Sequence, residues 1–287
     1  MKRIHVIFLC LIGLSFQSCD STISKKKTDV NSQSFNDRLY EMIDNGYRMV
    51  RCARADSAHV YLESARIQAE SAEKPDSATL GRIYNGLGLY YIQLMDDLPS
   101  GIDAFSIACK QVAGKPEAEK ELDRFLINIA MAYGMGNNEN AGLRYAEEAY
   151  RKGLEQNDSS VIHDSALTLA ELKLKSKDIA EGRKYIDIAR QYQRNIPNDH
   201  RITMLIAEGL LKETEADYKT AESEYTLATE VDEAPVFLRL KSLLLLASLK
   251  SRNGMPQDAI NVLNQGLRIA GHNKVRTYLP EIFTMLA

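Results

Sequence analysis

One spacing of small residues recurs six times along this chain of 287 residues. In each copy, a small residue is followed four positions later by a residue that is usually bulky, and three positions after that by a second small residue. The copies are Ala58, Leu62, Ala65; Gly101, Phe105, Ala108; Gly142, Ala146, Ala149; Gly182, Ile186, Ala189; Ala221, Tyr225, Ala228; and Ala259, Leu263, Gly266. Steps of four and three positions return to the same face of an α-helix. The spacing therefore predicts six helices, each with a stripe of small residues.

A further small residue precedes each copy at a nearly fixed distance. These residues are Gly46, Gly88, Ala130, Ala170, Gly209 and Ala247, 12 positions before the copy in every case except Gly88, where the distance is 13. A fixed offset between two small residues predicts two helices that cross at one close contact, in every repeat. The copies start at positions 58, 101, 142, 182, 221 and 259, so the repeat length runs 43, 41, 40, 39 and 38. Such a unit holds two helices and two short turns.

The first helix of several units carries a second recurrent pattern. Tyr84, Leu87, Gly88 and Tyr91 precede the copy at Gly101, and Leu126, Ile129, Ala130 and Tyr133 precede the copy at Gly142. Together the patterns resemble the tetratricopeptide repeat (TPR), a helix–turn–helix unit. The resemblance covers residues 35–287 and implies an all-α fold: a right-handed superhelical solenoid of about six TPR-like helix pairs plus a C-terminal helix, with a concave groove.

The chain departs from the TPR pattern in three respects, one of which is that Asn45 and Glu208 stand where other units have an apolar residue. Its repeat length exceeds the usual 34 residues, so helices or turns must be longer. Lys173, Lys212 and Lys250 also stand where Tyr91 and Tyr133 supply an aromatic ring in other units.

The first 18 residues are expected to be a signal peptide. Lys2 and Arg3 form a positive start, and Ile4 to Leu14 is an apolar run well short of the roughly 20 residues that span a bilayer. The sequence Phe16-Gln17-Ser18-Cys19 then resembles a bacterial lipoprotein signal.

The lipoprotein resemblance implies that Cys19 becomes the lipidated first residue of the mature protein. Residues 19–34 are polar, include three consecutive lysines from Lys25, and are expected to form a flexible tether. Acyl chains bind membranes through their buried methylene groups, so this reading predicts a lipoprotein of the cell envelope that faces the periplasm. The alternative is cleavage nearby, with a free thiol at Cys19.

Composition and residue spacing give no indication of catalysis. The net charge is −3 and no basic block occurs, so nucleic acid is not an expected partner. The mature histidines, His59, His163, His200 and His272, are far apart in sequence, and none pairs with another at metal-ligand spacing. We expect isolated surface or helix-end histidines, no catalytic residues, no metal, no cofactor and no small-molecule substrate. Cys52 and Cys109 are expected to be buried free thiols; the alternative is a disulfide, which an exported compartment permits.

A binding surface remains as the expected functional feature. In TPR proteins the first helix of each pair lines the groove, and this register places Tyr40, Ile43, Tyr47, Arg82, Asn85, Leu89, Arg124, Ile127 and Met131 on that face, followed by Asp164, Leu167 and Glu171 in the fourth unit. The first nine are apolar, aromatic and basic, which suits an extended peptide or helix with an acidic or carboxylate group. The alternative is that several of them only pack between helices.

Two functions fit this sequence. The first is a non-catalytic TPR scaffold that binds a protein or peptide and is anchored to the bacterial cell envelope. The second is the sensory TPR half of a membrane-associated transcriptional or signalling regulator whose output module is not in this chain. The segment from Asn273 to Ala287 resembles the first helix of a seventh unit; either it packs back as a closing lid or the repeat is interrupted there.

Overall fold

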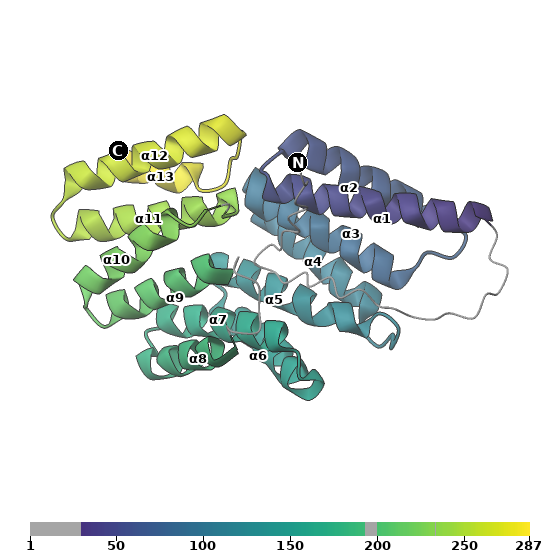
Figure 1. Cartoon of the computed structure of the whole chain (residues 1–287), viewed down its shortest axis with the longest axis horizontal. Coiled ribbons are helices and arrows are strands. Elements are labelled where there is room, and N and C mark those ends of the chain that lie inside the picture. The colour runs from purple at the N-terminus through teal and green to yellow at the C-terminus, as the bar shows by residue number, and fades with distance from the viewer. Residues whose placement is uncertain (1–29, 193–199, 233) are drawn as a thin grey trace, which may run out of the picture.

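The computed structural model describes residues 30–192, 200–232 and 234–287, and every regular element within these ranges is helical. The elements are α1 (Val30–Arg51), α2 (Ala55–Glu70), α3 (Ser77–Tyr90), the π-helix η1 (Tyr91–Met95), α4 (Leu98–Val112), α5 (Glu119–Met135), α6 (Glu139–Gln156), α7 (Ser159–Lys175), α8 (Ile179–Tyr192), α9 (Arg201–Thr214), α10 (Tyr218–Thr229), α11 (Val236–Arg252), α12 (Pro256–Asn273) and α13 (Leu279–Leu286). Within the described ranges, consecutive α-helices form six pairs and α13 follows the last pair (Figure 1). This confirms the expected all-α, TPR-like solenoid.

A left-handed residue separates the two helices of each pair. Positive φ angles occur at Ala53, Asp96, Asn137, Lys177, Ala216 and Gly254. These positions are five residues before the six sequence copies, so they repeat at the same intervals. A left-handed residue ends a helix by turning the chain back on itself. In four pairs an aspartate or asparagine directly follows and caps the second helix, at Asp97, Asn138, Asp178 and Asp217.

The small residues mark the predicted close crossings. A Cβ atom added to Gly88 would lie 2.4 Å from the Phe105 ring, and one added to Gly209 would lie 2.4 Å from the Tyr225 ring. Both rings are buried, so neither has space to move away. The first helix of these pairs therefore needs glycine because the second helix places an aromatic ring against its backbone.

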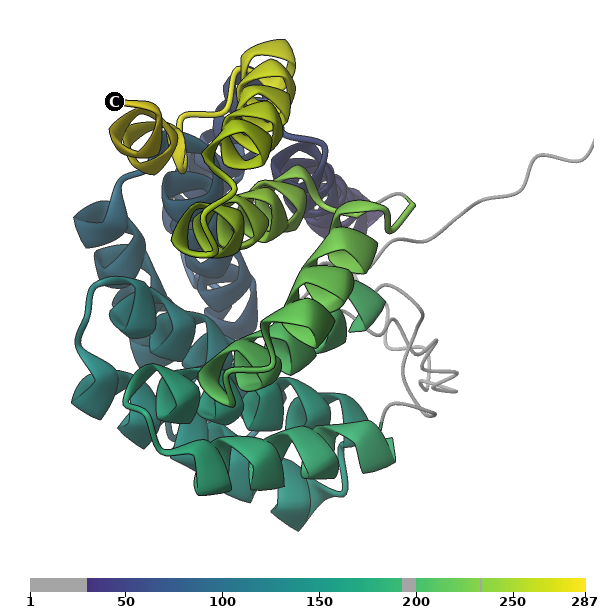
Figure 2. The ribbon, with the colours of Figure 1, turned by 90° about the vertical axis from the view of Figure 1, so that its left-hand side faces the viewer.

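The superhelix curls until the segment between its last two helices contacts its second repeat (Figure 2). The amide of Arg276 donates to the Leu94 carbonyl at 3.0 Å, and the Thr277 hydroxyl donates to the Ile92 carbonyl at 2.7 Å. Both carbonyls belong to η1, at the end of a helix where carbonyl groups have no partner within the helix. The segment after α12 thus packs against the N-terminal repeats, and we call residues 275–279 the closing segment.

The N-terminal boundary differs from the expectation. Helix α1 begins at Val30, within the stretch that was predicted to be a flexible tether, rather than at Phe35. Residues 1–29, including the expected signal peptide and Cys19, lie outside the described residues. Among the helices that the structure describes, none has the length and apolar character needed to cross a membrane.

The two cysteines differ in accessibility, which corrects the expectation of two buried thiols. Cys52 follows the last residue of α1 and is exposed, because the turn to α2 turns it outward, whereas Cys109 is partly buried on α4. Burial raises the pKa of the Cys109 thiol to about 12, so at pH 8 it stays protonated and unreactive.

We expect a thiol reagent to modify Cys52 quickly and Cys109 only on unfolding, measured by peptide mass mapping; equal rates of modification would contradict this difference in accessibility.

Candidate functional site

A cavity of about 160 Å³ lies inside the superhelix, between three first helices of the repeats. Its lining residues are Met131, Gly134 and Met135 of α5; Thr168, Glu171, Leu172 and Lys175 of α7; Phe237 and Lys241 of α11; and Tyr278 of the closing segment. We call it the central cavity. Apolar cavities of similar size hold a ligand as large as benzene, so the central cavity has room for one apolar side chain.

The charged groups of the central cavity are paired. Lys241 Nζ contacts Glu171 Oε1 at 2.6 Å, which joins α7 to α11 across the cavity. Lys175 Nζ donates to the Gly134 carbonyl at 2.6 Å and to Asn137 Oδ1 at 2.7 Å, which joins α7 to the end of α5. These contacts satisfy the lysines without a ligand and place three charged groups around an otherwise apolar wall.

Tyr278 forms the side of the central cavity that the repeats themselves do not provide. It has a φ of 65°, a left-handed conformation that is uncommon for a bulky residue, and its ring stacks on Phe237 with centroids 5.3 Å apart. Burial raises the pKa of its hydroxyl, so the ring is neutral at physiological pH. The closing segment therefore shapes the cavity as well as joining the two ends of the superhelix.

A second, smaller cavity of about 30 Å³ adjoins the first. It shares Met131, Thr168, Glu171 and Lys241 with the central cavity and adds Ile127, Asp164, Leu167, Thr203, Ile206, Ala207 and Leu238. The two cavities follow the inner faces of α5, α7, α9 and α11. The concave side of the last four pairs thus carries two adjoining, partly open cavities.

The structure places the nine predicted groove residues in three different environments. Ile43, Tyr47, Asn85, Leu89 and Ile127 are buried, Arg82, Arg124 and Met131 are partly buried, and Tyr40 is exposed. Ile127 and Met131 line the cavities. At the other end of the superhelix, Arg82 lies over the Tyr40 ring, 5.6 Å from its centroid, and pairs with Asp44.

Two of the predicted residues belong to a buried polar chain across the first three pairs. Asn128 donates to Asn85 at 2.7 Å, Asn85 donates to the Tyr47 hydroxyl at 2.9 Å, and that hydroxyl donates to the Arg82 carbonyl at 2.7 Å. Each buried polar group that finds such a partner avoids the cost of desolvation. The chain therefore fixes α1, α3 and α5 relative to one another.

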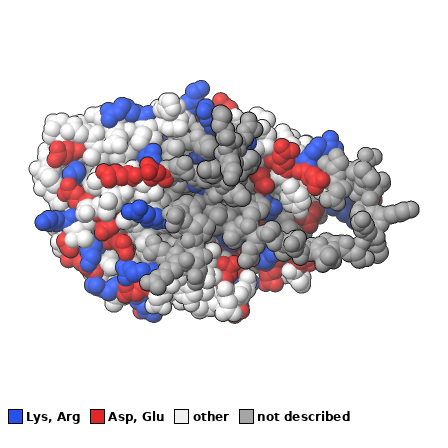
Figure 3. All heavy atoms as spheres, viewed as in Figure 1, with Lys and Arg blue, Asp and Glu red and all other residues white. Residues whose placement is uncertain are grey.

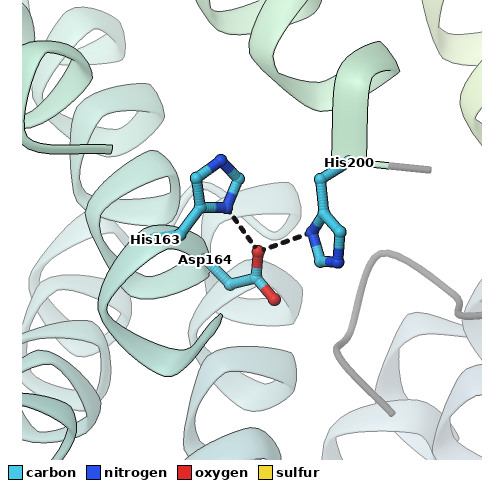
Figure 4. Close-up of side chains that lie close together, drawn as sticks. All are labelled: His163, Asp164 and His200. Carbon is cyan, nitrogen blue, oxygen red and sulfur yellow. Dashed lines mark hydrogen bonds and ion pairs between the residues drawn. The ribbon is translucent and has the colours of Figure 1, made fainter. Parts of the chain in front are cut away.

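A buried cluster on α7 and at the start of α9 contradicts the expectation of isolated histidines. His163 Nδ1 and His200 Nδ1 lie 2.8 and 2.9 Å from the same oxygen, Asp164 Oδ1 (Figure 4). His163 is not at a surface or a helix end: it lies within α7 and is 0 % exposed. Burial alone would raise the pKa of Asp164, but the attraction and hydrogen bonds of the two histidines outweigh it and hold that pKa well below its ordinary value.

Several cavity residues lie outside the sequence-based set. Lys175, Phe237 and Lys241 occupy first helices of the fourth and sixth pairs. Lys241 lies six positions before Ala247, as Arg82 lies six positions before Gly88, so the register extended to the sixth pair would have included it. Lys175 and Phe237 lie at other positions of the repeat, so the register does not find them. Tyr278 follows the last complete repeat, so the repeat register does not predict which way its side chain points.

Acidic and basic side chains are intermixed on the described part of the outer face seen in Figure 3.

No known family model matches this sequence, and no curated protein matches it. The fold is similar to a Rap protein complexed with competence and sporulation factor, with 15 % identity, a TM-score of 0.60 and coverage of 86 % of this chain and 80 % of the Rap chain. It is also similar to NprR in complex with its cognate peptide NprX, with 13 % identity, a TM-score of 0.67 and coverage of 86 % of this chain and 71 % of NprR. At such identities the likeness shows the fold, a TPR-type helical repeat.

Proposed function

We propose that this protein is a non-catalytic scaffold that binds a peptide or protein segment in its interior and is anchored to the bacterial cell envelope through Cys19. The central cavity carries the binding half of the proposal. Its apolar wall, with Met131, Leu172 and Phe237, suits one apolar side chain, and the Lys241–Glu171 pair can exchange partners with polar groups of a ligand. The NprR structure supports a peptide as the ligand class, because it is a complex with the peptide NprX.

Filling the central cavity is expected to remove peptide binding. Peptides would be selected from a random phage-displayed library on the wild-type protein and their affinities measured by fluorescence anisotropy. In Met131→Trp, the indole occupies the space that a ligand side chain needs, so these peptides should bind at least about tenfold more weakly, which corresponds to about 1.4 kcal/mol.

Leu227→Trp provides the matched control for this experiment. Leu227 is exposed on α10, away from the cavity lining, so the same substitution there should leave the affinity unchanged. Circular dichroism would establish that both variants keep the helical content of the wild type. Selected peptides that bind Met131→Trp as tightly as the wild type would remove the cavity from the proposal.

The anchoring half of the proposal depends on the sequence before α1. The pattern that ends in Cys19 supports lipidation, and an acyl chain contributes about 0.8 kcal/mol of membrane affinity per buried methylene group. The proposal assigns the protein to the envelope, facing the periplasm, with a protein or peptide partner and no nucleic acid, cofactor or small-molecule substrate.

Cys19→Ser is expected to release the protein from the membrane. In cells grown with a labelled fatty acid, the wild-type protein should carry the label and sediment with membranes, whereas the variant should be unlabelled and appear in the periplasmic fraction. Cys52→Ser is the control, since it removes an exposed thiol and should retain both label and location. An unlabelled wild-type protein would refute lipid anchoring and leave the binding proposal intact.

A further inference from the structure

We propose that His163, Asp164 and His200 bind one divalent transition-metal ion of the zinc class, which ties the fourth repeat to the fifth. Their donor atoms all lie within 4.8 Å of one another. The side chains come from α7 and from the residue directly before α9, and they are almost fully buried, with residue exposures of 0 %, 5 % and 1 %. Two imidazole nitrogens with one carboxylate oxygen form a donor set that zinc commonly takes, whereas calcium and magnesium prefer oxygen donors alone.

The donor atoms already converge on one point. A divalent ion bound between them would take the place of the two Nδ1 protons, each of which would move to Nε2, and its charge would offset that of the buried Asp164 carboxylate. The ring nitrogens that now point at Asp164 Oδ1 (Figure 4) are the same atoms that would coordinate the ion.

Geometry defines the adjustment that binding requires. With metal–ligand bonds of about 2.0–2.1 Å, donor atoms 2.8 Å apart subtend about 85° at the ion, and tetrahedral geometry needs about 3.3 Å. Zinc has no electronic preference for one geometry. Binding therefore needs the two imidazole–carboxylate distances to open by about 0.5 Å, and it needs the two imidazole nitrogens, which lie within 4.8 Å of each other, to be no more than about 4.1 Å apart. The small cavity beside Asp164, of about 30 Å³, has room for a water molecule as a fourth ligand.

The ion would add a cross-link that the repeat pattern does not contain. His163 and Asp164 are consecutive on α7, and His200 is the residue directly before α9. The inner faces of these helices also line the small cavity through Leu167 and Thr203. A metal at this position therefore stabilises one wall of the interior, independently of whether a peptide binds there.

The test begins with wild-type protein that has been treated with EDTA and then titrated with ZnCl₂. Native mass spectrometry should show one zinc per chain, and binding should raise the thermal unfolding midpoint. Nitrogen NMR of the imidazoles gives a sharper result. Hydrogen bonding alone places the ring proton on Nδ1 of His163 and His200, whereas coordination through Nδ1 moves that proton to Nε2. This measurement needs no variant and so does not depend on a variant's ability to fold.

Variants locate the site. His200→Gln should lower zinc affinity by more than the roughly 10- to 100-fold typical of outer-shell losses, while His272→Gln, at an exposed histidine on α12, should retain wild-type affinity. Absence of stoichiometric zinc in the wild type, or unchanged ring tautomers on adding zinc, would overturn the proposal and leave a hydrogen-bonded triad. Equal zinc affinity in His200→Gln and the wild type would overturn it as well.

Discussion

Replacement of Phe105 by alanine is expected to lower the free energy of unfolding by about 3–5 kcal/mol. Phe105 is 1 % exposed and its ring packs against the backbone at Gly88, where α3 and α4 cross. Removing the ring leaves a cavity between two helices whose backbones cannot approach further. Chemical denaturation followed by circular dichroism measures the effect.

The same contact predicts a specific coupling between the two positions. Gly88→Ala adds a Cβ atom 2.4 Å from the ring, so in the wild-type background it should cost about 1–3 kcal/mol through overpacking. In the Phe105→Ala background the obstruction is gone, and the higher helix propensity of alanine should make the change neutral or stabilising by up to about 1 kcal/mol. An equal cost of Gly88→Ala in both backgrounds would show that the ring is not what requires glycine.

This crossing also shows how far the sequence predicts the fold. The offset from Gly88 to the copy at Gly101 predicted both helices and their close contact, because contacts between the helices of a pair repeat with the sequence. The left-handed residues at Ala53, Lys177 and Ala216 follow the same intervals, yet their side chains give no sign of it. Alanine and lysine have no preference for positive φ, so the repeated fold imposes this conformation on them.

Contacts between distant repeats could not be predicted in the same way. The hydrogen bond from Thr277 to Ile92 joins residues 185 positions apart, and it depends on the sum of small rotations between successive repeats. His163 and His200 belong to adjacent repeats, but they meet only because α7 packs against the start of α9, and no local spacing encodes that contact. The absence of metal-ligand spacing in a sequence is therefore weak evidence against a metal site in a repeat protein.

The candidate site illustrates the same limit. The repeat register assigns Ile127 and Met131 to the inner side, and both residues line the cavities. The register does not show which inner-side residues are covered by packing against other helices. It also assigns Ile43 and Leu89 to the groove, and both are buried. The role of the nine predicted residues in binding a partner remains a prediction, and Met131 is the one that the cavity experiment addresses.

Substitution of Asp164 by leucine is expected to destabilise the protein by about 3–5 kcal/mol, even with EDTA present to remove any metal. The carboxylate is the shared acceptor for His163 and His200, and all three side chains are buried. Leucine offers no acceptor, so two ring N–H groups lose their partner in the interior, and removing one member of a buried charged network typically costs this much.

Asp164→Asn keeps an acceptor oxygen at this position but removes the negative charge. The asparagine carbonyl oxygen can still accept from both rings, but hydrogen bonds to a neutral acceptor contribute less than charge-assisted ones, so a loss of about 2 kcal/mol is expected. Asp44→Asn is the matched control, because the Asp44 side chain is 50 % exposed in its pair with Arg82 and exposed pairs contribute at most about 1 kcal/mol. Chemical denaturation of the three variants in EDTA should rank the losses as Asp164→Leu, then Asp164→Asn, then Asp44→Asn. A leucine variant as stable as the wild type would mean that the triad does not hold α7 against α9.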